Sequence, residues 1–189
     1  MPAEGIYRIR SGKVKVVEQR GDREHIIALL GAGDYIGVEA LFEGAFYKVS
    51  AYALEDVSAY FLTREQVNEL IRRRPQLYDE LLDVLTSIVS RVEREDEEIL
   101  VTGSTTERLA EVLLGLLEKF GENEQGYLDI RISQSDLADL AHISRQTLYR
   151  ILNRWKQQGW IRMSGSHLQI TCRECLERLQ EKESGLVLV

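Results

Sequence analysis

The side chains with the clearest chemistry stand in or beside the stretch between Leu140 and Arg173, which contains no Asp or Glu although the 189-residue chain holds 31 acidic residues. A guanidinium group can make paired hydrogen bonds to guanine, and a glutamine amide can do the same to adenine. Hydroxyl groups and further cations can hold phosphates and so fix the register of a protein on DNA. The residues that we expect to contact DNA are Ser133, Ser135, Ser144, Arg145, Gln146, Thr147, Tyr149, Arg150 and Arg154.

Two helices joined by a short turn would have to position these side chains. Ser133 precedes the first helix and Ser144 the second, and a serine at such a position commonly caps the helix that follows. Apolar side chains fall where the two helices face each other: Leu137, Ala138, Ala141, Ile143, Leu148, Ile151 and Leu152. This spacing is typical of a helix-turn-helix. It leaves Arg145, Gln146 and Arg150 on the outer face, where we expect them to read bases.

The remaining polar residues of the segment are expected to position the protein on DNA. We assign phosphate contacts to Ser133, Ser135, Thr147 and Arg154, while Tyr149 lies on the outer face with the base-reading residues. After the second helix, residues 160–163 and 167–170 alternate as strands around a Ser-Gly-Ser turn. The sequence therefore predicts a winged helix-turn-helix.

Charge is distributed unevenly along the chain, whose net charge is −7. Residues 1–103 hold 13 Lys and Arg against 19 Asp and Glu, whereas residues 104–189 hold 11 against 12. The acid-free stretch and its end carry six cations: Arg145, Arg150, Arg154, Lys156, Arg162 and Arg173. Such a local basic field suits DNA phosphates. The alternatives are a helical bundle with one basic surface helix and a ligand-binding module with no DNA function.

No pattern in the chain is typical of an enzyme. The sequence suggests no Ser/His/Asp or Cys/His grouping, and it contains no Walker loop and no glycine-rich dinucleotide turn. The glycines fall between strands and not before a helix. We therefore expect a binding protein.

The first half of the chain consists of short β-type runs punctuated by glycine, at residues 6–9, 13–17, 25–30, 48–53 and 57–62. This pattern predicts a small antiparallel barrel or roll. Thr63 to Gln66 has the spacing of a capping box and begins a helix. A second helix is predicted over residues 76–101, with apolar positions Leu77, Leu81, Val84 or Leu85, Ile88, Val92 and Ile99. We expect this stripe to meet a second copy of itself; the alternative is packing within its own chain.

Several of these segments resemble the CRP/FNR superfamily of bacterial transcription regulators: Gly12–Val16, Gly33–Gly37, Ala40–Phe42, Arg108–Ala110 and Ser144–Leu152. The resemblance covers nearly the whole chain and implies an α+β fold with an N-terminal β-roll (a double-stranded β-helix), a dimerising helix and a C-terminal winged helix-turn-helix. The implied divisions are 1–74 for the roll, 75–103 for the dimerisation helix, 104–173 for the DNA-binding domain, and 174–189 for a last helix and tail.

The resemblance also implies how the protein acts. We expect a homodimer, joined through residues 75–103, on double-stranded DNA with a pseudo-palindromic operator, and contact with RNA polymerase if the protein is an activator. The chain begins later than the family pattern, which leaves two alternatives: the roll is truncated, or this sequence lacks the first residues of the roll.

The effector of the roll is less well specified. Family members that bind cyclic nucleotides hold the phosphate with backbone amides, a glutamate directly after the glycine, and an Arg-Ser or Arg-Thr pair. Here Val38 follows Gly37, and Tyr47 to Val49 stands where the pair belongs. The candidate effector pocket comprises Gly37, Val38, Glu39, Lys48 and Val49.

Because Lys48 alone could balance a phosphate in this pocket, we do not expect cyclic AMP and leave the effector as an unknown small molecule or none. A cyclic-nucleotide-responsive regulator is the alternative. An iron–sulfur cluster of the FNR kind is excluded, because it needs N-terminal cysteines.

The two cysteines, Cys172 and Cys175, are too few and too close for the disulfide framework of a secreted domain. A single CxxC lacks the second pair that a structural zinc site needs, so no metal is expected. Thr171 and Glu174 have capping-box spacing, which favours the start of a last helix; a redox switch is the alternative.

The sequence has no apolar run long enough for a membrane span and no secretion signal at its start. We therefore expect a cytoplasmic protein without a membrane partner.

Overall fold

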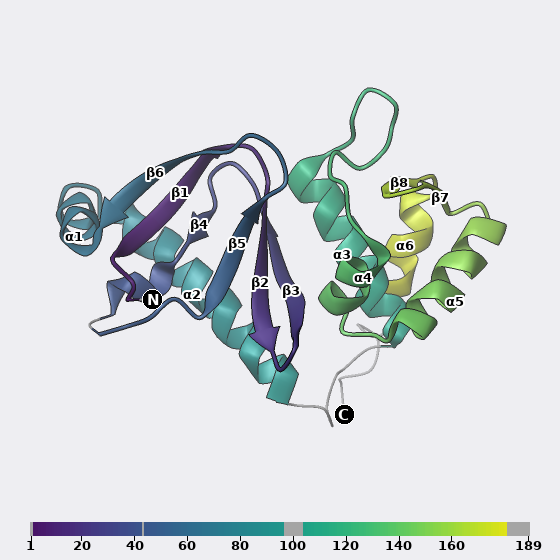
Figure 1. Ribbon diagram of the computed structural model, residues 1–189. Coiled ribbons are helices and arrows are strands. Elements are labelled where there is room, and N and C mark those ends of the chain that lie inside the picture. Colours follow the sequence, from purple (N-terminus) through teal and green to yellow (C-terminus); the bar gives the residue numbers. More distant parts are fainter. Residues whose placement is uncertain (1, 43, 97–103, 181–189) are drawn as a thin grey trace, which may run out of the picture. The chain divides into compact units, whose positions relative to one another are not determined.

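The computed structural model describes residues 2–42, 44–96 and 104–180, with the backbone alone for residues 87–96. The chain divides into two compact units, residues 1–101 and 102–189 (Figure 1). The first unit consists of two small sheets and two α-helices, and the second of helices with a two-stranded sheet. This architecture confirms the predicted α+β class.

Two three-stranded antiparallel sheets form the roll of the first unit. One has the order β4 (Tyr35–Ile36), β1 (Gly5–Ser11) and β6 (Ser58–Thr63), and the other the order β3 (Arg23–Leu30), β2 (Val14–Arg20) and β5 (Val49–Ala53). Ile6, Val14 and Val16 are among the buried side chains that fill the roll. The turn from β1 to β2 requires Gly12, whose φ is +88° and where a Cβ would lie 2.4 Å from the carbonyl oxygen of Asp56.

A short 3-10 helix, η1 (Val38–Leu41), and two α-helices, α1 (Arg64–Arg73) and α2 (Gln76–Asp96), complete the first unit. The predicted capping box of α1 is confirmed, because Thr63 Oγ1 accepts a hydrogen bond from Gln66 N and Gln66 Oε1 accepts one from Thr63 N. Residues 97–101 of the predicted long helix lie outside the described residues. In the described ranges no helix, α2 included, is long and apolar enough to cross a bilayer.

The apolar stripe of α2 packs in part on its own roll, which the sequence left as the alternative. Leu81 is only 3% exposed and belongs to the same buried cluster as Ile6 and Tyr35. The flanking side chains Leu77, Val84 and Leu85 pack against that cluster. They are therefore used within the chain, where they cover one cluster of the roll together with η1 and α1. Ile88, Val92 and Ile99 of the predicted stripe have side chains outside the described residues.

The second unit is built on α3 (Thr105–Phe120), whose predicted capping box of Ser104 and Glu107 is present. The other elements are α4 (Gln134–Leu140), α5 (Arg145–Gln157), β7 (Ile161–Ser164), β8 (His167–Ile170) and α6 (Arg173–Gln180). Helices α4, α5 and α6 all contact α3. Their shared core consists of side chains with almost no solvent exposure, among them Leu109, Leu113, Leu128, Leu137, Leu148, Trp155, Ile161, Leu168 and Leu176.

Residues 127–132 do not form the strand that their alternation predicts. Leu128, Ile130 and Ile132 are buried as expected. However, the backbone hydrogen bonds of this segment with the β8 hairpin are separate ones, from Leu128 N to Leu168 O at 2.8 Å and from Ile132 N to Ser166 O at 3.4 Å. An extended segment can bury alternate side chains without the continuous hydrogen-bond ladder of a strand.

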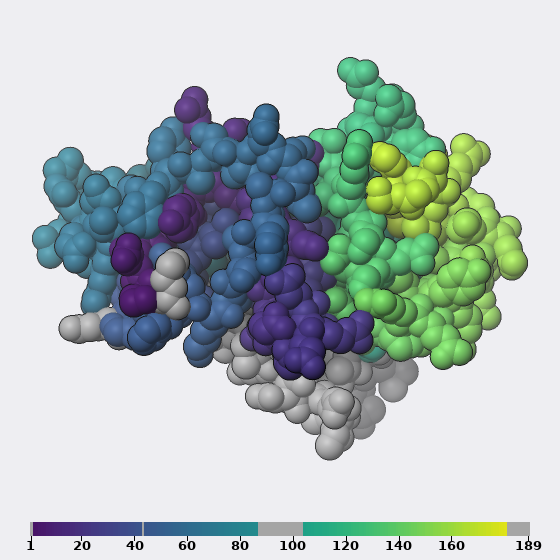
Figure 2. All heavy atoms as spheres, viewed as in Figure 1, coloured from purple at the N-terminus to yellow at the C-terminus, as the bar shows by residue number. Residues whose placement is uncertain are grey.

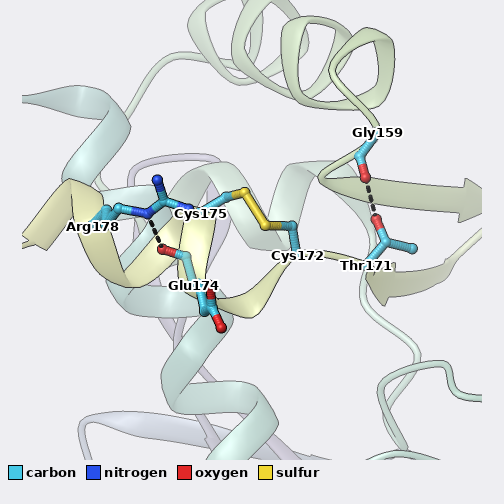
Figure 3. Close-up of a disulfide and its surroundings, with 6 residues drawn as sticks. All are labelled: Gly159, Thr171, Cys172, Glu174, Cys175 and Arg178. Atoms are coloured by element: carbon cyan, nitrogen blue, oxygen red, sulfur yellow. Dashed lines mark hydrogen bonds between the residues drawn. A yellow bond between two sulfur atoms is a disulfide. The ribbon is translucent and has the colours of Figure 1, made fainter.

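The two cysteines form a disulfide at the start of α6, with Cα atoms 5.3 Å apart (Figure 3). The predicted capping box of Thr171 and Glu174 is wrong, because α6 begins at Arg173. Thr171 Oγ1 instead donates a hydrogen bond of 2.6 Å to the carbonyl oxygen of Gly159.

Candidate nucleic-acid interface

Both helices of the predicted helix-turn-helix begin at a capping serine. Ser133 Oγ accepts a hydrogen bond from Asp136 N at 3.0 Å and donates one to Asp136 Oδ2 at 2.8 Å. Ser144 Oγ accepts from Thr147 N at 3.0 Å and donates to Thr147 Oγ1 at 2.9 Å. These bonds satisfy amide groups that a helix start leaves without partners, so the two serines fix where α4 and α5 begin.

The turn between α4 and α5 is held by a residue that sequence analysis did not assign to the site. Arg108 on α3 donates from Nε to the carbonyl oxygen of Ala141 at 3.1 Å and from Nη2 to that of His142 at 3.2 Å. His142 has a φ of +49°, a left-handed conformation that is uncommon for a residue other than glycine. Arg108 thus joins α3 to the strained point of the turn. The one sign of this role in the sequence was an arginine directly before Leu109 and Ala110, which are buried in the structure.

Helix α5 divides into a buried face and an exposed face. Leu148, Ile151, Leu152 and Trp155 are buried against the rest of the unit. The exposed face carries Arg145, Gln146, Tyr149, Arg150 and Arg154, and the Tyr149 side chain is 61% exposed. Atoms of the α5 region reach the surface on the face drawn in Figure 2, in light green. The division agrees with the predicted inner and outer faces.

The exposed face of α5 borders a broad hollow that also reaches Thr106 at the start of α3. Its lining is Thr106, Gln146, Thr147, Tyr149, Arg150, Ile151, Asn153, Arg154 and Gln157. The side chains of Gln146, Arg150 and Arg154 form no hydrogen bond or ion pair with any residue that the structure describes. Their donors are therefore available for a ligand, and a guanidinium without a partner favours an anionic one.

Arg145 differs from the other exposed arginines. Its Nη2 donates a hydrogen bond of 2.5 Å to Ser135 Oγ, so the residue expected to read a base and one expected to hold a phosphate contact each other. This bond crosses from α5 to α4 and depends on how the helices meet, which the sequence does not specify. To contact DNA, the Arg145 guanidinium would have to give up its hydrogen bond to Ser135 or divide its donors between Ser135 and DNA.

One cation of the basic stretch is already neutralised. Arg173 forms ion pairs with Glu177 at 2.7 Å and with Glu118 at 3.6 Å. The hydrogen bond to Glu177 raises the pKa of the Arg173 guanidinium, followed in importance by the charge of the same carboxylate. Arg173 therefore stabilises α6 on α3 and adds little to the field around α5.

The candidate effector residues of the roll are in part covered by other side chains. Gly37 has a φ of +78°, and a Cβ on it would lie 2.7 Å from the ring of Tyr47. The Tyr47 hydroxyl donates to the carbonyl oxygen of Gly5 and accepts from Gly5 N at 3.2 Å. Val38 is 2% exposed in the roll core, whereas the Lys48 side chain is exposed.

Tyr47 thus covers the glycine, and Lys48, the one cation among the five candidate positions, faces solvent. Glu39 is half-buried and brings a carboxylate, and Val49 packs on a core cluster, so neither side chain supplies a donor to balance a phosphate. The sequence contained Tyr47 but gave no sign that its ring would fill this space.

The chain is similar to known proteins in both units. Residues 1–74 match the family model of the cyclic nucleotide-binding domain, and residues 107–179 match that of the Crp-like helix-turn-helix domain. The CRP-like cAMP-activated global transcriptional regulator of Mycobacterium tuberculosis is 31% identical over 180 residues, which cover 94% of this chain and 80% of that protein.

Two further comparisons agree with this match. The cyclic AMP receptor protein of Thermus thermophilus is 30% identical over 178 residues, 93% of this chain and 79% of that protein. The solved structure of FixK2 from Bradyrhizobium japonicum superposes with a TM-score of 0.73 at 24% identity and covers 95% of this chain and 88% of that one. This last likeness is one of fold.

Proposed function

The chain belongs to the CRP/FNR family of DNA-binding transcription regulators, and on that premise we propose that it acts as a homodimer on a pseudo-palindromic operator. The observation that carries the proposal is the exposed face of α5, where Gln146, Arg150 and Arg154 have no partner among the described residues. In a dimer, two such helices would enter successive major grooves about 34 Å apart.

Within each half-site we propose a division of roles along the motif. Arg145, Gln146 and Arg150 contact base edges, since each can make paired hydrogen bonds. Ser135, Thr147 and Arg154 contact phosphates. Ser133 does so as well once its hydroxyl hydrogen leaves Asp136 Oδ2, while Ser133 Oγ still accepts the capping bond from Asp136 N. Ser144 caps α5, and the exposed Tyr149 ring adds contact area beside the bases.

Dimerisation is proposed through residues 75–103. The face of α2 that does not cover the roll exposes Tyr78 by 55% and Leu82 by 41%, and these two positions are four residues apart on one side of the helix. A second copy of α2 would bury them. This support concerns only the first half of the helix, whose side chains the structure describes.

For the roll we propose that a cyclic nucleotide is not the effector, because Tyr47 covers Gly37 and Lys48 is exposed. The second candidate function is a cyclic-nucleotide response, which is favoured by the names of the M. tuberculosis and T. thermophilus relatives. A thermal-shift measurement with cyclic AMP separates the two, since a ligand that binds the native state raises its Tm. We expect no rise; a concentration-dependent rise would establish the second candidate.

We further propose that the protein works in the cytoplasm as a regulator and not as a catalyst, with RNA polymerase as a partner if it activates transcription. The DNA-binding role supports this proposal, because the DNA that the protein would bind lies in the cytoplasm.

A mobility-shift series at increasing salt tests the proposed function. The Arg150→Ala/Arg154→Ala double variant should bind promoter fragments much more weakly than the wild type, because neutralised phosphates and base contacts are both lost. The matched control is Arg23→Ala/Arg72→Ala, which removes the same charge from exposed positions of the first unit. Equal loss in both variants, or binding that does not respond to salt, would contradict the proposal.

A further inference from the structure

The disulfide between Cys172 and Cys175 joins the two cysteines of the chain and is not explained by DNA contact. Both cysteines are half-buried, so small thiols and peroxides can reach them. Cys172 directly precedes the first residue of α6, and Cys175 lies in its first turn (Figure 3). A helix N-terminus stabilises a thiolate, which is the reactive form of cysteine.

The backbone beside Cys172 is bonded to the end of the DNA-reading helix. The amides of Thr171 and Cys172 both donate to the carbonyl oxygen of Trp160, at 2.8 and 3.1 Å, and Thr171 Oγ1 donates to Gly159 O at 2.6 Å. Gly159 and Trp160 in turn donate to Lys156 O and Trp155 O in the last turn of α5. A short chain of hydrogen bonds therefore connects the disulfide with α5.

The other side of the disulfide is firmly anchored. Leu176, one residue beyond Cys175, has no solvent exposure, and Arg173 pairs with Glu118 of α3. The disulfide thus lies between an anchored helix and the segment that ends α5. Closing the S–S bond restrains the backbone of residues 172–175, and with it the amides that hold Trp160.

We propose that Cys172 and Cys175 form a redox switch that adjusts DNA affinity, with the disulfide form binding the operator more tightly. The inference rests on the proposed function. The disulfide fixes in advance the segment that supports α5, and a preorganised surface binds with less loss of conformational freedom. The two cysteines close a loop too short to restrict the unfolded chain strongly, so a purely stabilising role is the weaker explanation.

The chemistry of the switch balances with ordinary cellular reactants. For reduction, a thiolate of a dithiol reductant attacks one sulfur, the S–S bond breaks, and the second thiol of the reductant displaces the protein thiolate. The protein gains two electrons and two protons, and the reductant becomes a disulfide. For oxidation, one thiolate attacks hydrogen peroxide, the O–O bond breaks, and the sulfur becomes a sulfenic acid while the departing hydroxide is protonated to water. The other thiolate then attacks the sulfenic sulfur, the S–O bond breaks with loss of a second water molecule, and the S–S bond forms.

The proposed cytoplasmic location favours a redox-sensing role for the two cysteines. Thiols of cytosolic proteins are kept reduced, and disulfides that form there are commonly catalytic or redox-sensing. A transcription regulator with one disulfide beside its DNA-reading helix fits the sensing class.

The test measures DNA affinity of the full-length protein in both redox forms. The probes are a fragment that the protein itself selects from a random-sequence pool and a scrambled fragment of equal composition. Thiol titration should give no free thiols before dithiothreitol treatment and two after it. We expect the disulfide form to bind the selected fragment at least about fivefold more tightly, the low end of common coupling between sites, and hydrogen peroxide to restore that affinity.

The Cys172→Ser/Cys175→Ser variant is the control, and its affinity should equal that of the reduced wild type with or without dithiothreitol. Equal affinity of the two wild-type forms for the selected fragment would overturn the switch, as would a dithiothreitol response that persists in the variant. Loss of preference for the selected over the scrambled fragment in both forms would instead contradict the proposed function. A thiol count that stays at zero throughout a series of glutathione redox buffers also overturns the switch, independently of DNA.

Discussion

At the scale of single residues, the polar side chains of α4 and α5 differ in whether they already have a partner. Ser133 and Ser144 are engaged as caps, and Arg145 is bonded to Ser135. The side chains of Arg150 and Arg154 form no hydrogen bond or ion pair with the described residues. The same helix therefore contains side chains that build the motif and side chains that remain available to DNA.

This difference leads to a prediction about specificity. Arg150→Ala should cost about 1 to 3 kcal/mol on the selected operator and little on scrambled DNA, because a base contact is lost. Arg154→Ala should weaken binding to both by a similar factor, because a phosphate contact carries no sequence information. Competition binding with both fragments measures this, with Arg72→Ala as a control that should change neither affinity. A uniform loss for Arg150→Ala would show that its assigned role is wrong.

Whether the role of each of these residues could be predicted depends on how far apart in the sequence the interacting residues lie. The capping roles of Ser133 and Ser144 could be predicted because a cap is formed within four residues of sequence. The bond from Arg145 to Ser135 spans ten residues and the bonds from Arg108 to the turn span more than thirty, so both depend on how helices pack. The Cys172–Cys175 spacing was compatible with a disulfide but could not predict one. Spacing alone cannot distinguish a pair of reactive thiols from the start of a helix.

At the scale of elements, the turn of the helix-turn-helix depends on a neighbouring helix. Arg108 of α3 supplies two hydrogen bonds to carbonyl groups at a point where His142 adopts a left-handed conformation. Hydrogen bonds from a charged donor contribute more than neutral ones. The angle between α4 and α5 is thus held from outside the motif.

Arg108→Ala should lower the free energy of unfolding of the second unit by about 1.5 to 3 kcal/mol, because the carbonyl groups lose a charged donor. Urea denaturation followed by tryptophan fluorescence reports this unit, since both tryptophans of the chain, Trp155 and Trp160, lie in it. Arg131→Ala, at an exposed position of the same unit, should change the stability by less than about 0.5 kcal/mol. Similar effects of the two substitutions would contradict the role of Arg108.

In the first unit, one hydrogen bond links the roll with α2. The Tyr35 hydroxyl donates to Glu80 Oε2 at 3.1 Å, and burial followed by this bond raises the pKa of Tyr35. The unfolded chain therefore releases the proton at lower pH than the folded chain does. This difference in pKa adds to the free energy of unfolding. The added stability is fully present below a pH of about 10, the ordinary pKa of tyrosine, and is lost as the pH rises through the pKa of Tyr35 in the folded chain.

The Tyr35→Phe variant should consequently lose less stability than the wild type between about pH 9 and 11. Urea denaturation followed by circular dichroism at several pH values measures the difference. Tyr52, whose pKa is raised by its hydrogen bond to Glu24, is present in both proteins and cancels in the comparison. The same decline in both proteins would show that Tyr35 does not couple its proton to folding.

The elements themselves were predictable where pattern and packing agree. Short alternating runs predicted the roll, and helix caps predicted the starts of α1, α3, α4 and α5. Two expectations at this scale differ from the structure, at least in part, because of tertiary packing. Residues 127–132 bury alternate side chains without forming a ladder, and the first half of the α2 stripe covers its own roll.

At the scale of the whole molecule, two units and a helix with two apolar faces suggest an assembly of two chains. One face of α2 is used by the roll, while Tyr78 and Leu82 stay exposed. Leu82→Glu should shift the protein from dimer to monomer, because a carboxylate would be buried without a partner in the dimer. Sedimentation velocity at micromolar concentration measures this, with the exposed Arg72→Glu on α1 as the control. A dimer as stable as that of the wild type would place the interface elsewhere.

The central claim, symmetric reading of DNA through α5, is tested most directly by selecting binding sites from a random-sequence pool with the full-length protein. We predict an inverted repeat whose half-site centres lie about 10 base pairs apart, one turn of the double helix, and an affinity that falls steeply with salt. Enrichment of no sequence, or of a single half-site without a symmetric mate, would contradict the account.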